Sequence, residues 1–174
     1  MRAEIKKFWI WWEKNEALIR KVVELGSEAK LLELKEHIDR KILSFGHFTW
    51  EITEGEKKKY NFVISPNREF ERLQQSKQII KAAPEMTYWE FHYAKQINQS
   101  PESFKLYDEN QDPVYIDPSA WQIEIQDAVV HVDAADLTEI DEETRNHAMD
   151  LVVTAYFGEE FRITRIKEIK LRIR

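Results

Sequence analysis

One pattern occurs twice along this chain: two short strands, then a helix, then one more strand. The first copy runs roughly from Thr49 to Tyr93 and the second roughly from Trp121 to Ile173. Short links between successive strands favour antiparallel pairing, and a helix is then needed to cover one face of the sheet. The sequence therefore predicts an α+β fold with antiparallel sheet, built from two ββαβ units whose shared order suggests a pseudo-repeat.

The strands are recognised because apolar and polar residues alternate, which places every second side chain on the same face of a sheet. Trp50 and Ile52 show this alternation in the first copy, and Ile123 and Ile125 show it in the second. Between the copies, residues 95–120 hold three of the five prolines and two further short strands. The predicted strands cover residues 50–53, 61–65, 89–93, 104–107, 114–116, 121–125, 130–132 and 169–174.

Two amphipathic helices precede the first strand. Apolar residues recur at helical spacing over residues 3–25, where Gly26 is a natural stop, and again from Ser27 to Gly46. The short link between these segments predicts an N-terminal helical hairpin. We expect this hairpin to pack on the antiparallel sheet.

The helix of each copy has a recognisable start and end. Asn67, after Pro66, is a good N-terminal cap for the first helix, which ends before Pro84. Asp141, together with Thr138, resembles a capping pair for the second. The predicted buried stripes are Phe70, Leu73, Lys77 and Ile80 in the first helix, and Thr144, Ala148, Leu151, Val152, Ala155 and Tyr156 in the second, which stops at Gly158.

The length of the chain bounds its organisation. A chain of 174 residues buries on the order of 70% of its unfolded surface, which gives a stable core without a disulfide or a metal. We interpret residues 1–174 as one domain with two sub-domains. Residues 1–95 hold the helical hairpin and the first ββαβ unit, and residues 96–174 hold the connector and the second unit.

Composition disfavours several classes of protein. The chain has no cysteine, which removes disulfides, thiolate catalysis and cysteine-based metal centres. Its net charge of −6 disfavours a general nucleic-acid binder, which needs clustered cations. The one dense apolar run, from Phe8 to Trp12, is too short for a signal-peptide core or a membrane span. We therefore expect a soluble, cytoplasmic protein without a cofactor and without a membrane partner.

Six short motifs are spread along most of the chain: Phe8-Trp9 through Asn15-Glu16, Trp50-Glu51-Ile52, Val63-Ile64-Ser65-Pro66-Asn67, Ala83-Pro84, Trp89-Glu90-Phe91 and Phe157-Gly158-Glu159. Together they resemble an uncharacterised family of bacterial proteins. That family pairs an N-terminal aromatic helix with a W-E … I-S-P-N … A-P … W-E-F block and ends a late helix in an [LF]-G-E turn. The resemblance implies a bacterial α+β protein with no known activity, so it supplies no catalytic residues. Arg68 stands where the family often has glycine, which weakens the case for a backbone anion site there.

Two histidines lie beside carboxylates at strand spacing. Glu90 precedes His92 by two residues, and His131 precedes Asp133 by two. At this spacing each pair leaves the same face of its sheet, so it offers imidazole and carboxylate groups for metal binding or acid–base chemistry. The alternative interpretation is a solvated polar face, the usual meaning of polar alternation. With Glu51 and Asn61 on the first sheet, the polar faces around His92 and His131 give our second hypothesis, a small-ligand binder or an enzyme.

Other charged segments have simpler explanations than a functional site. The acidic run from Asp133 to Glu143 lacks the central glycine and ligand spacing of an EF-hand, and its later members suit a helix N-terminus. The basic residues from Arg162 to Arg174 fit the solvent face of a strand, although phosphate or RNA binding is a weaker alternative. Asn67 and Arg68 are placed to receive an anion at a helix start, or simply to cap it.

The aromatic residues of the first helix carry the leading functional hypothesis. From Phe8 to Trp12 every side of the helix carries an aromatic or aliphatic residue, and only one stripe can face the local core, so Trp11 and Ile10 are left over. We assign Trp9, Trp11 and Trp12 to a contact surface that excludes water. Surplus tryptophans belong in the centre of a protein interface, or else a neighbouring element of the same chain buries them. We therefore favour a non-catalytic protein-interaction or regulatory module that uses this aromatic surface, with a protein partner or a second copy of the chain bound to it.

Overall fold

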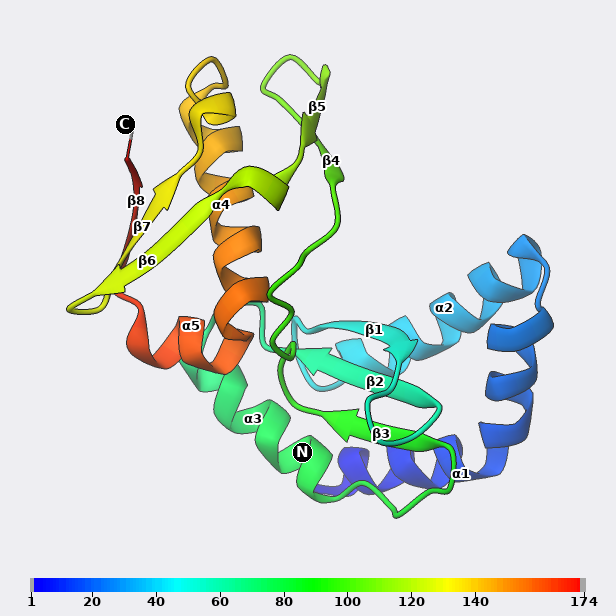
Figure 1. Cartoon of the computed structure of the whole chain (residues 1–174). Coiled ribbons are helices and arrows are strands. Elements are labelled where there is room, and N and C mark those ends of the chain that lie inside the picture. The colour runs from blue at the N-terminus through cyan, green and yellow to red at the C-terminus, as the bar shows by residue number, and fades with distance from the viewer. Residues whose placement is uncertain (1, 173–174) are drawn as a thin grey trace. The chain divides into compact units, whose positions relative to one another are not determined.

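A computed structural model describes residues 2–172 of the chain. The chain forms two compact units, Met1–Ala94 and Lys95–Arg174, and each is described on its own (Figure 1). We call them unit 1 and unit 2. Both combine helices with a three-stranded sheet, so the α+β class predicted from the sequence is confirmed.

Unit 1 begins with the two predicted helices and continues with a ββαβ unit. Its strands are ordered β1-β2-β3, with β1 antiparallel and β3 parallel to the central strand β2. Gly26 directly follows the last residue of helix α1, as expected. The elements are α1 (Arg2–Leu25), α2 (Glu28–Leu43), β1 (Thr49–Glu54), β2 (Tyr60–Ser65), α3 (Phe70–Lys81) and β3 (Trp89–His92).

The core of unit 1 is aromatic, and α1 supplies much of it. The Trp12 side chain is fully buried, with its ring 4.3 Å from that of Phe62 on β2 and 5.2 Å from that of Trp89 on β3. The Trp9 indole donates a hydrogen bond of 2.8 Å to the backbone carbonyl of Ile79, which joins α1 to α3. Rings packed edge to face bury large apolar areas, so these contacts hold the first helix on the sheet.

Unit 2 repeats the strand order of unit 1 after an additional hairpin. The order is β6-β7-β8, with β6 antiparallel and β8 parallel to the central strand β7. The hairpin β4–β5 forms a two-stranded antiparallel sheet of its own. The elements are β4 (Phe104–Tyr107), β5 (Pro113–Ile116), η1 (Pro118–Ala120), β6 (Gln122–Gln126), β7 (Val129–Asp133), η2 (Ala135–Leu137), α4 (Glu142–Phe157), α5 (Glu159–Arg165) and β8 (Glu168–Arg172).

The core of unit 2 is aliphatic. Val130 and Val132 of β7 are fully buried, in one cluster with Leu137 and with Ala148 and Val153 of α4. Alternate residues of β7 thus reach the helix, as the period of two predicts.

The two units share one topology, and the direction of their last strands refines the prediction of antiparallel sheet. In each unit a tight hairpin reverses the chain, and the helical crossover then carries it back to the end where the middle strand began. The last strand therefore runs parallel to the middle one, as a crossover connection requires. The sheets are antiparallel in their hairpins and parallel in the third strand.

Three local predictions about helices are corrected. Helix α3 begins at Phe70 with Glu69 as its N-cap, so Asn67 does not cap it. The buried side of α3 carries Leu73, Ser76 and Ile79, while Phe70 of the predicted stripe is 59% exposed. A separate helix, α5, follows Gly158, where the sequence suggested one basic stretch running into the final strand.

The predicted stripe of the later helix α4 is only partly right. Thr144, Ala148 and Val152 are buried as expected, whereas Leu151 and Ala155 are only partly buried. Asp141 is the N-cap, because its carboxylate accepts a 2.9 Å hydrogen bond from the backbone N–H of Thr144. The stop at Gly158 has a backbone reason, since this residue has a positive φ of 82°.

Candidate functional site

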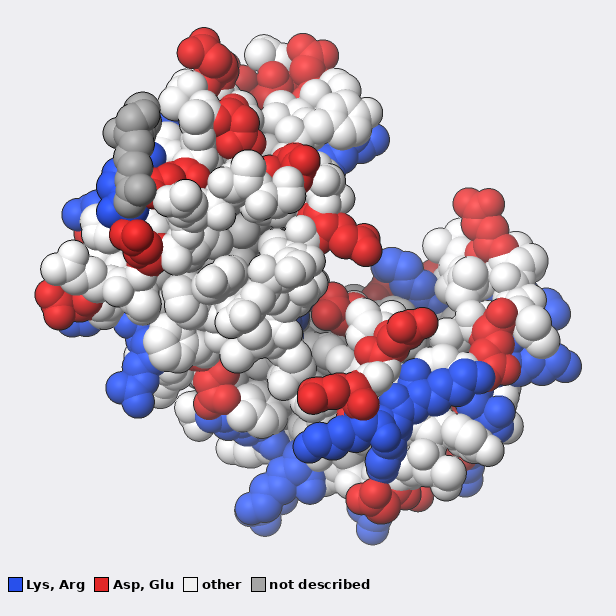
Figure 2. All heavy atoms as spheres, viewed as in Figure 1, with Lys and Arg blue, Asp and Glu red and all other residues white. Residues whose placement is uncertain are grey.

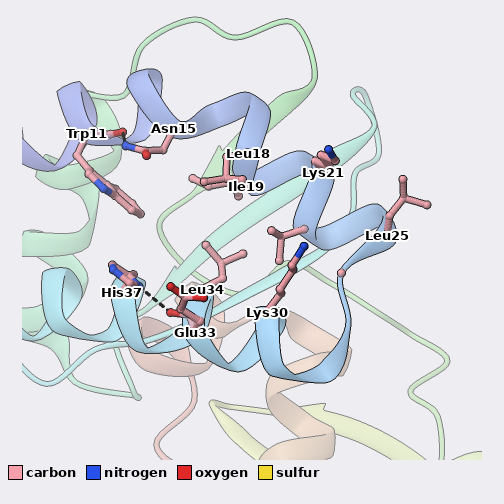
Figure 3. Close-up of a pocket in the computed structure, with 12 residues that line it drawn as sticks. Trp11, Asn15, Leu18, Ile19, Lys21, Leu25, Lys30, Glu33, Leu34 and His37 are labelled. Atoms are coloured by element: carbon pink, nitrogen blue, oxygen red, sulfur yellow. Dashed lines mark hydrogen bonds between the residues drawn. The ribbon is translucent and has the colours of Figure 1, made fainter.

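The best-formed concave site of unit 1 is a groove between α1 and α2 (Figure 3). Its volume is about 400 Å³. In Figure 3 the Trp11 side chain extends from α1 toward α2, and the Leu34 side chain extends from α2 toward α1. We call this feature the α1–α2 groove. It is an apolar cleft walled by two helices.

The groove exists because α1 carries two apolar stripes. One stripe, which includes Ile5, Phe8 and Trp12, is buried in the core of unit 1. The other advances in steps of four and three residues, the spacing of a coiled-coil seam. This second stripe consists of Trp11, Asn15, Leu18, Val22 and Leu25, all of which line the groove.

The seam is closed at the Trp11 end and open at the Leu25 end. Trp11 is partly buried, whereas Leu18 is 60% and Leu25 is 79% exposed. Ile19, a core residue that is 1% exposed, forms the floor of the groove. Single exposed leucines are normal, but two that line one cleft are a candidate interaction surface.

A partly buried hydrogen bond connects α2 to the sheet of unit 1. The Trp50 indole of β1 donates a 2.7 Å hydrogen bond to the carboxylate of Asp39, which also forms a 2.6 Å ion pair with Lys35. Burial alone raises the pKa of Asp39, but the hydrogen bonds from Lys35 and Trp50 outweigh it, so the pKa lies below the usual aspartate value. The ionised Asp39 therefore helps to fix one wall of the groove.

Most polar groups near the closed end of the groove already have partners. The side-chain amide of Asn15 donates a 2.7 Å hydrogen bond to the backbone carbonyl of Trp11. The Lys41 ammonium lies 4.5 Å from the centre of the Trp11 ring, a cation–π distance. The His37 ring is hydrogen-bonded to the backbone carbonyl of Glu33 at 2.8 Å.

Two cations border the groove. Lys21 and Lys30 line it without forming an ion pair to any described residue, and Glu33 is the one carboxylate-bearing residue among the lining. Three other basic residues of the same helices are in ion pairs, Lys7–Glu4, Arg20–Glu16 and Lys35–Asp39. With two lysines against one glutamate, the lining of the groove carries an excess of positive charge beside its apolar floor.

The positive charge at the groove agrees with the net positive charge of unit 1 as a whole. Residues 1–94 contain 17 Lys and Arg against 15 Asp and Glu, a net charge of +2, whereas residues 95–174 contain 9 against 17, a net charge of −8. In Figure 2 a band of Lys and Arg crosses the visible face of unit 1. The overall charge of −6 therefore conceals a weakly basic unit.

The three tryptophans predicted to form a contact surface have different places. Trp9 and Trp12 are 3% and 0% exposed in the core of unit 1, so they cannot form the exposed patch predicted for them. The sheet and α3 supply enough facing area to bury both rings, which the helix periodicity alone did not reveal. Trp11 is the one left outside this core stripe, and it lines the groove.

The polar face of the unit 1 sheet brings some of the predicted residues together. Asn61 on β2 is in register with Glu90 on β3, and Val63 is in register with both His92 and Glu51. The Glu90 carboxylate accepts hydrogen bonds from the backbone N–H groups of Glu56 and Lys57. Glu90 therefore holds the turn between β1 and β2, which is a structural role.

In unit 2, Asp133 of the predicted pair His131 and Asp133 forms an ion pair with Arg172. The Arg172 guanidinium on β8 binds the Asp133 carboxylate at 2.6 and 2.8 Å and reaches Glu124 on β6 at 2.8 Å. These hydrogen bonds to Asp133 and Glu124 raise the pKa of Arg172 above its ordinary value. Arg172 thus joins three strands, and His131 lies in register with Glu124 and Lys170.

Asn67 and Arg68 form a turn, not the start of a helix. Both have positive φ angles, 52° and 66°. The Asn67 side chain accepts a 2.6 Å hydrogen bond from the Thr49 hydroxyl and donates one of 2.9 Å to the backbone carbonyl of His47. Asn67 therefore fastens the end of β2 to the start of β1, and the helix dipole needed for the predicted anion site begins elsewhere.

A hollow of about 540 Å³ in unit 2 has several polar and charged side chains in its lining, and some of them already form hydrogen bonds within the protein. The Trp121 indole donates hydrogen bonds of 3.0 and 3.3 Å to Asp136. The Asp117 carboxylate accepts a 3.0 Å hydrogen bond from the backbone N–H of Ser119, and hydrogen bonding to Ser119 lowers the pKa of Asp117. These contacts complete a helical turn and a loop and leave little chemistry free for a ligand.

The sequence contained a signal for the groove that periodicity arguments overlooked. Leu18, Val22 and Leu25 continue the spacing of Trp11 beyond the aromatic run. On the sequence alone, Val22 is placed in one stripe with Ile19 and Leu18 and Leu25 are not considered, so the second seam is not separated from the first. Lys21 and Lys30 carry no sequence signal of their own, since the absence of an ion-pair partner among the described residues depends on where α2 lies.

Comparisons with known proteins identify no relative: no family model, no curated protein and no solved structure matches this chain. Over residues 2–172, no group of three or more His, Asp or Glu side chains is placed to hold a metal ion. No helix in the same range is long and apolar enough to cross a membrane.

Proposed function

We propose that this protein is a non-catalytic interaction module, of a regulatory kind, whose binding surface is the α1–α2 groove. One observation carries the proposal: Leu18 and Leu25 stay largely exposed beside a cleft whose floor, at Ile19, is fully buried. Burying each exposed leucine contributes about 1.5–3 kcal/mol. A partner that covers these side chains thus gains affinity from surface that unit 1 leaves uncovered.

The polar sites support this assignment, because their charged groups stabilise the fold. Glu90 closes a turn and Asp133 is neutralised by Arg172. A catalytic carboxylate needs to be within hydrogen-bond reach of a substrate group, and both of these carboxylates already accept hydrogen bonds from the protein.

The experiment replaces the two leucines together, in the variant Leu18→Ser/Leu25→Ser. Leu43→Ser is the matched control, because Leu43 is 58% exposed on α2 but does not line the groove. We expect all three proteins to unfold at nearly the same temperature, since none of these side chains is buried. Association, measured as solution mass by light scattering and as partner capture quantified against the control, is lost only in the double variant.

The proposal fails if wild type, control and double variant have the same mass and the same binding partners. A second variant, Trp11→Ala, places the effect within the groove. We expect it to weaken association as well, and an unchanged association with a large loss of thermal stability assigns Trp11 to folding instead.

A second candidate function is a small-ligand site on the polar face of the unit 1 sheet. It is favoured by Asn61, which is 8% exposed and whose side-chain oxygen has no hydrogen-bond partner among residues 2–172. A buried polar atom without a partner costs about 1–3 kcal/mol, which a ligand donor would recover. A small-molecule thermal-shift screen tests this, with His92→Ala expected to abolish any stabilisation and His131→Ala, in unit 2, to leave it unchanged.

A further inference from the structure

We propose that the α1–α2 groove receives an acidic amphipathic helix of another protein, in preference to a second copy of this chain. This inference rests on the proposed function and adds the class of partner. Its evidence is the shape of the groove, the spacing of its apolar residues and the charges that border it.

The size of the groove decides what enters it. One turn of an α-helix, about 10 Å wide and 5.4 Å long, occupies roughly 420 Å³. The groove volume of about 400 Å³ therefore accepts a few side chains but not a whole helix. The partner lies along the cleft and inserts apolar side chains from one face.

The walls of the groove favour a helix over an extended strand. A bound strand needs free backbone N–H and C=O groups at a sheet edge, whereas the backbone groups inside a helix already bond to one another. The seam from Trp11 to Leu25 repeats in steps of four and three residues. A third helix with apolar side chains at the same spacing can pack these side chains into the seam, as in a coiled coil. It spans about 21 Å, the length of roughly 14 helical residues.

The charges choose between partners. Lys21 and Lys30 have no ion-pair partner among the described residues, and Lys41 lies over Trp11 at the closed end. Acidic residues flanking the apolar face of a partner helix would pair with these cations. A symmetric dimer through this face would bring four lysines (Lys21 and Lys30 of both copies) against two Glu33 carboxylates, so positive charge stays in excess.

The test uses the full chain and two designed peptides of about 16 residues. Both carry leucine at the same four-and-three spacing, and the remaining positions are mainly Glu in one peptide and mainly Lys in the other. Binding is measured by fluorescence anisotropy of the labelled peptides. We expect the acidic peptide to bind about tenfold more tightly than the basic one, from two or three exposed ion pairs. The preference should shrink as salt shortens the screening length.

Charge-reversal variants locate the effect. In Lys21→Glu/Lys30→Glu we expect the preference to move toward the basic peptide. The matched control is Lys6→Glu/Lys81→Glu, which changes the net charge equally at two exposed lysines outside the groove, and it should keep the preference for the acidic peptide. The double variant Leu18→Ser/Leu25→Ser should bind both peptides more weakly than wild type does.

Three outcomes overturn the inference, and they separate it from the proposed function. If both peptides bind equally well, or if Lys21→Glu/Lys30→Glu keeps the preference for the acidic peptide, the partner is not an acidic helix. The leucine variants then still test whether the groove is a binding surface. Binding of neither peptide also removes it. A wild-type dimer that Leu18→Ser/Leu25→Ser dissociates assigns the groove to a second copy, which upholds the proposed function and rejects this partner.

Discussion

In unit 1 the central strand β2 places Phe62 against Trp12 of an added helix, whereas in unit 2 the central strand β7 places Val130 and Val132 in a cluster with aliphatic residues of α4. Strand order and strand direction are nevertheless the same in both. The comparison shows that the ββαβ topology is set by the hairpin and the crossover, and that it tolerates very different side chains in its core.

The same comparison explains why the α1–α2 groove, the proposed binding surface, lies in unit 1. Aromatic side chains on β2 and β3 present a wide surface, and α1 covers it with large rings of its own. This packing uses only one stripe of α1, so the second stripe is left for α2 and for the groove. Unit 2 has no counterpart to this helical hairpin among its described residues; an additional β-hairpin precedes its sheet instead.

The largest expected effect contrasts the two cores. Trp12→Ala should lower the free energy of unfolding by about 3–5 kcal/mol, and Leu137→Ala in unit 2 by about 2–5 kcal/mol, because each side chain is fully buried. Leu25→Ala, at a 79% exposed position, should change it by about 0.5 kcal/mol or less. Urea unfolding followed by circular dichroism measures all three, and a Trp12→Ala protein as stable as Leu25→Ala contradicts the aromatic core.

An intermediate effect concerns the ends of the two crossover helices. Gly158, after α4, has a φ of +82°, and a Cβ placed there would lie 3.2 Å from the Ile97 side chain. Gly158→Ala should therefore cost about 1–2 kcal/mol. Ala82, after α3, has ordinary angles, so Ala82→Gly should cost less. If the two variants lower the unfolding temperature equally, the ends of α3 and α4 do not differ in their need for glycine.

The smallest expected effect is a pH dependence in unit 2. The hydrogen bond from the backbone N–H of Thr144 lowers the pKa of Asp141. A carboxylate whose pKa is lower in the folded state stabilises the protein fully above its unfolded pKa near 3.9, and this contribution is lost as the pH falls through the folded value. Asp141→Asn keeps a capping side chain without the charge.

The unfolding temperature of wild type should exceed that of Asp141→Asn by roughly a degree or two at neutral pH. The difference should disappear at acidic pH below 3.9, and calorimetry at a series of pH values measures it. A difference that stays constant down to pH 2 assigns the effect of Asp141 to something other than its charge.

Sequence reasoning succeeded where the signal was local. Alternation located the strands of both copies, Gly26 and Gly158 marked helix ends, and Asp141 was identified as part of a cap. It failed where a distant partner decides: Asn67 resembles a cap but is held by Thr49 and His47, which lie 18 and 20 residues away. The sequence likewise places Asp133 beside His131 but gives no sign of its ion-pair partner, because Arg172 lies 39 residues away.

By itself, the order of apolar and polar residues determined the α+β class and the repeated ββαβ unit, because period and turn chemistry act over a few neighbouring residues. Only the tertiary structure decided that Trp9 and Trp12 are both core residues, that Trp11 lines a groove, and that Lys21 and Lys30 have no ion-pair partner within residues 2–172. Burial and pairing depend on which surfaces far apart in sequence meet, and no local pattern records those contacts.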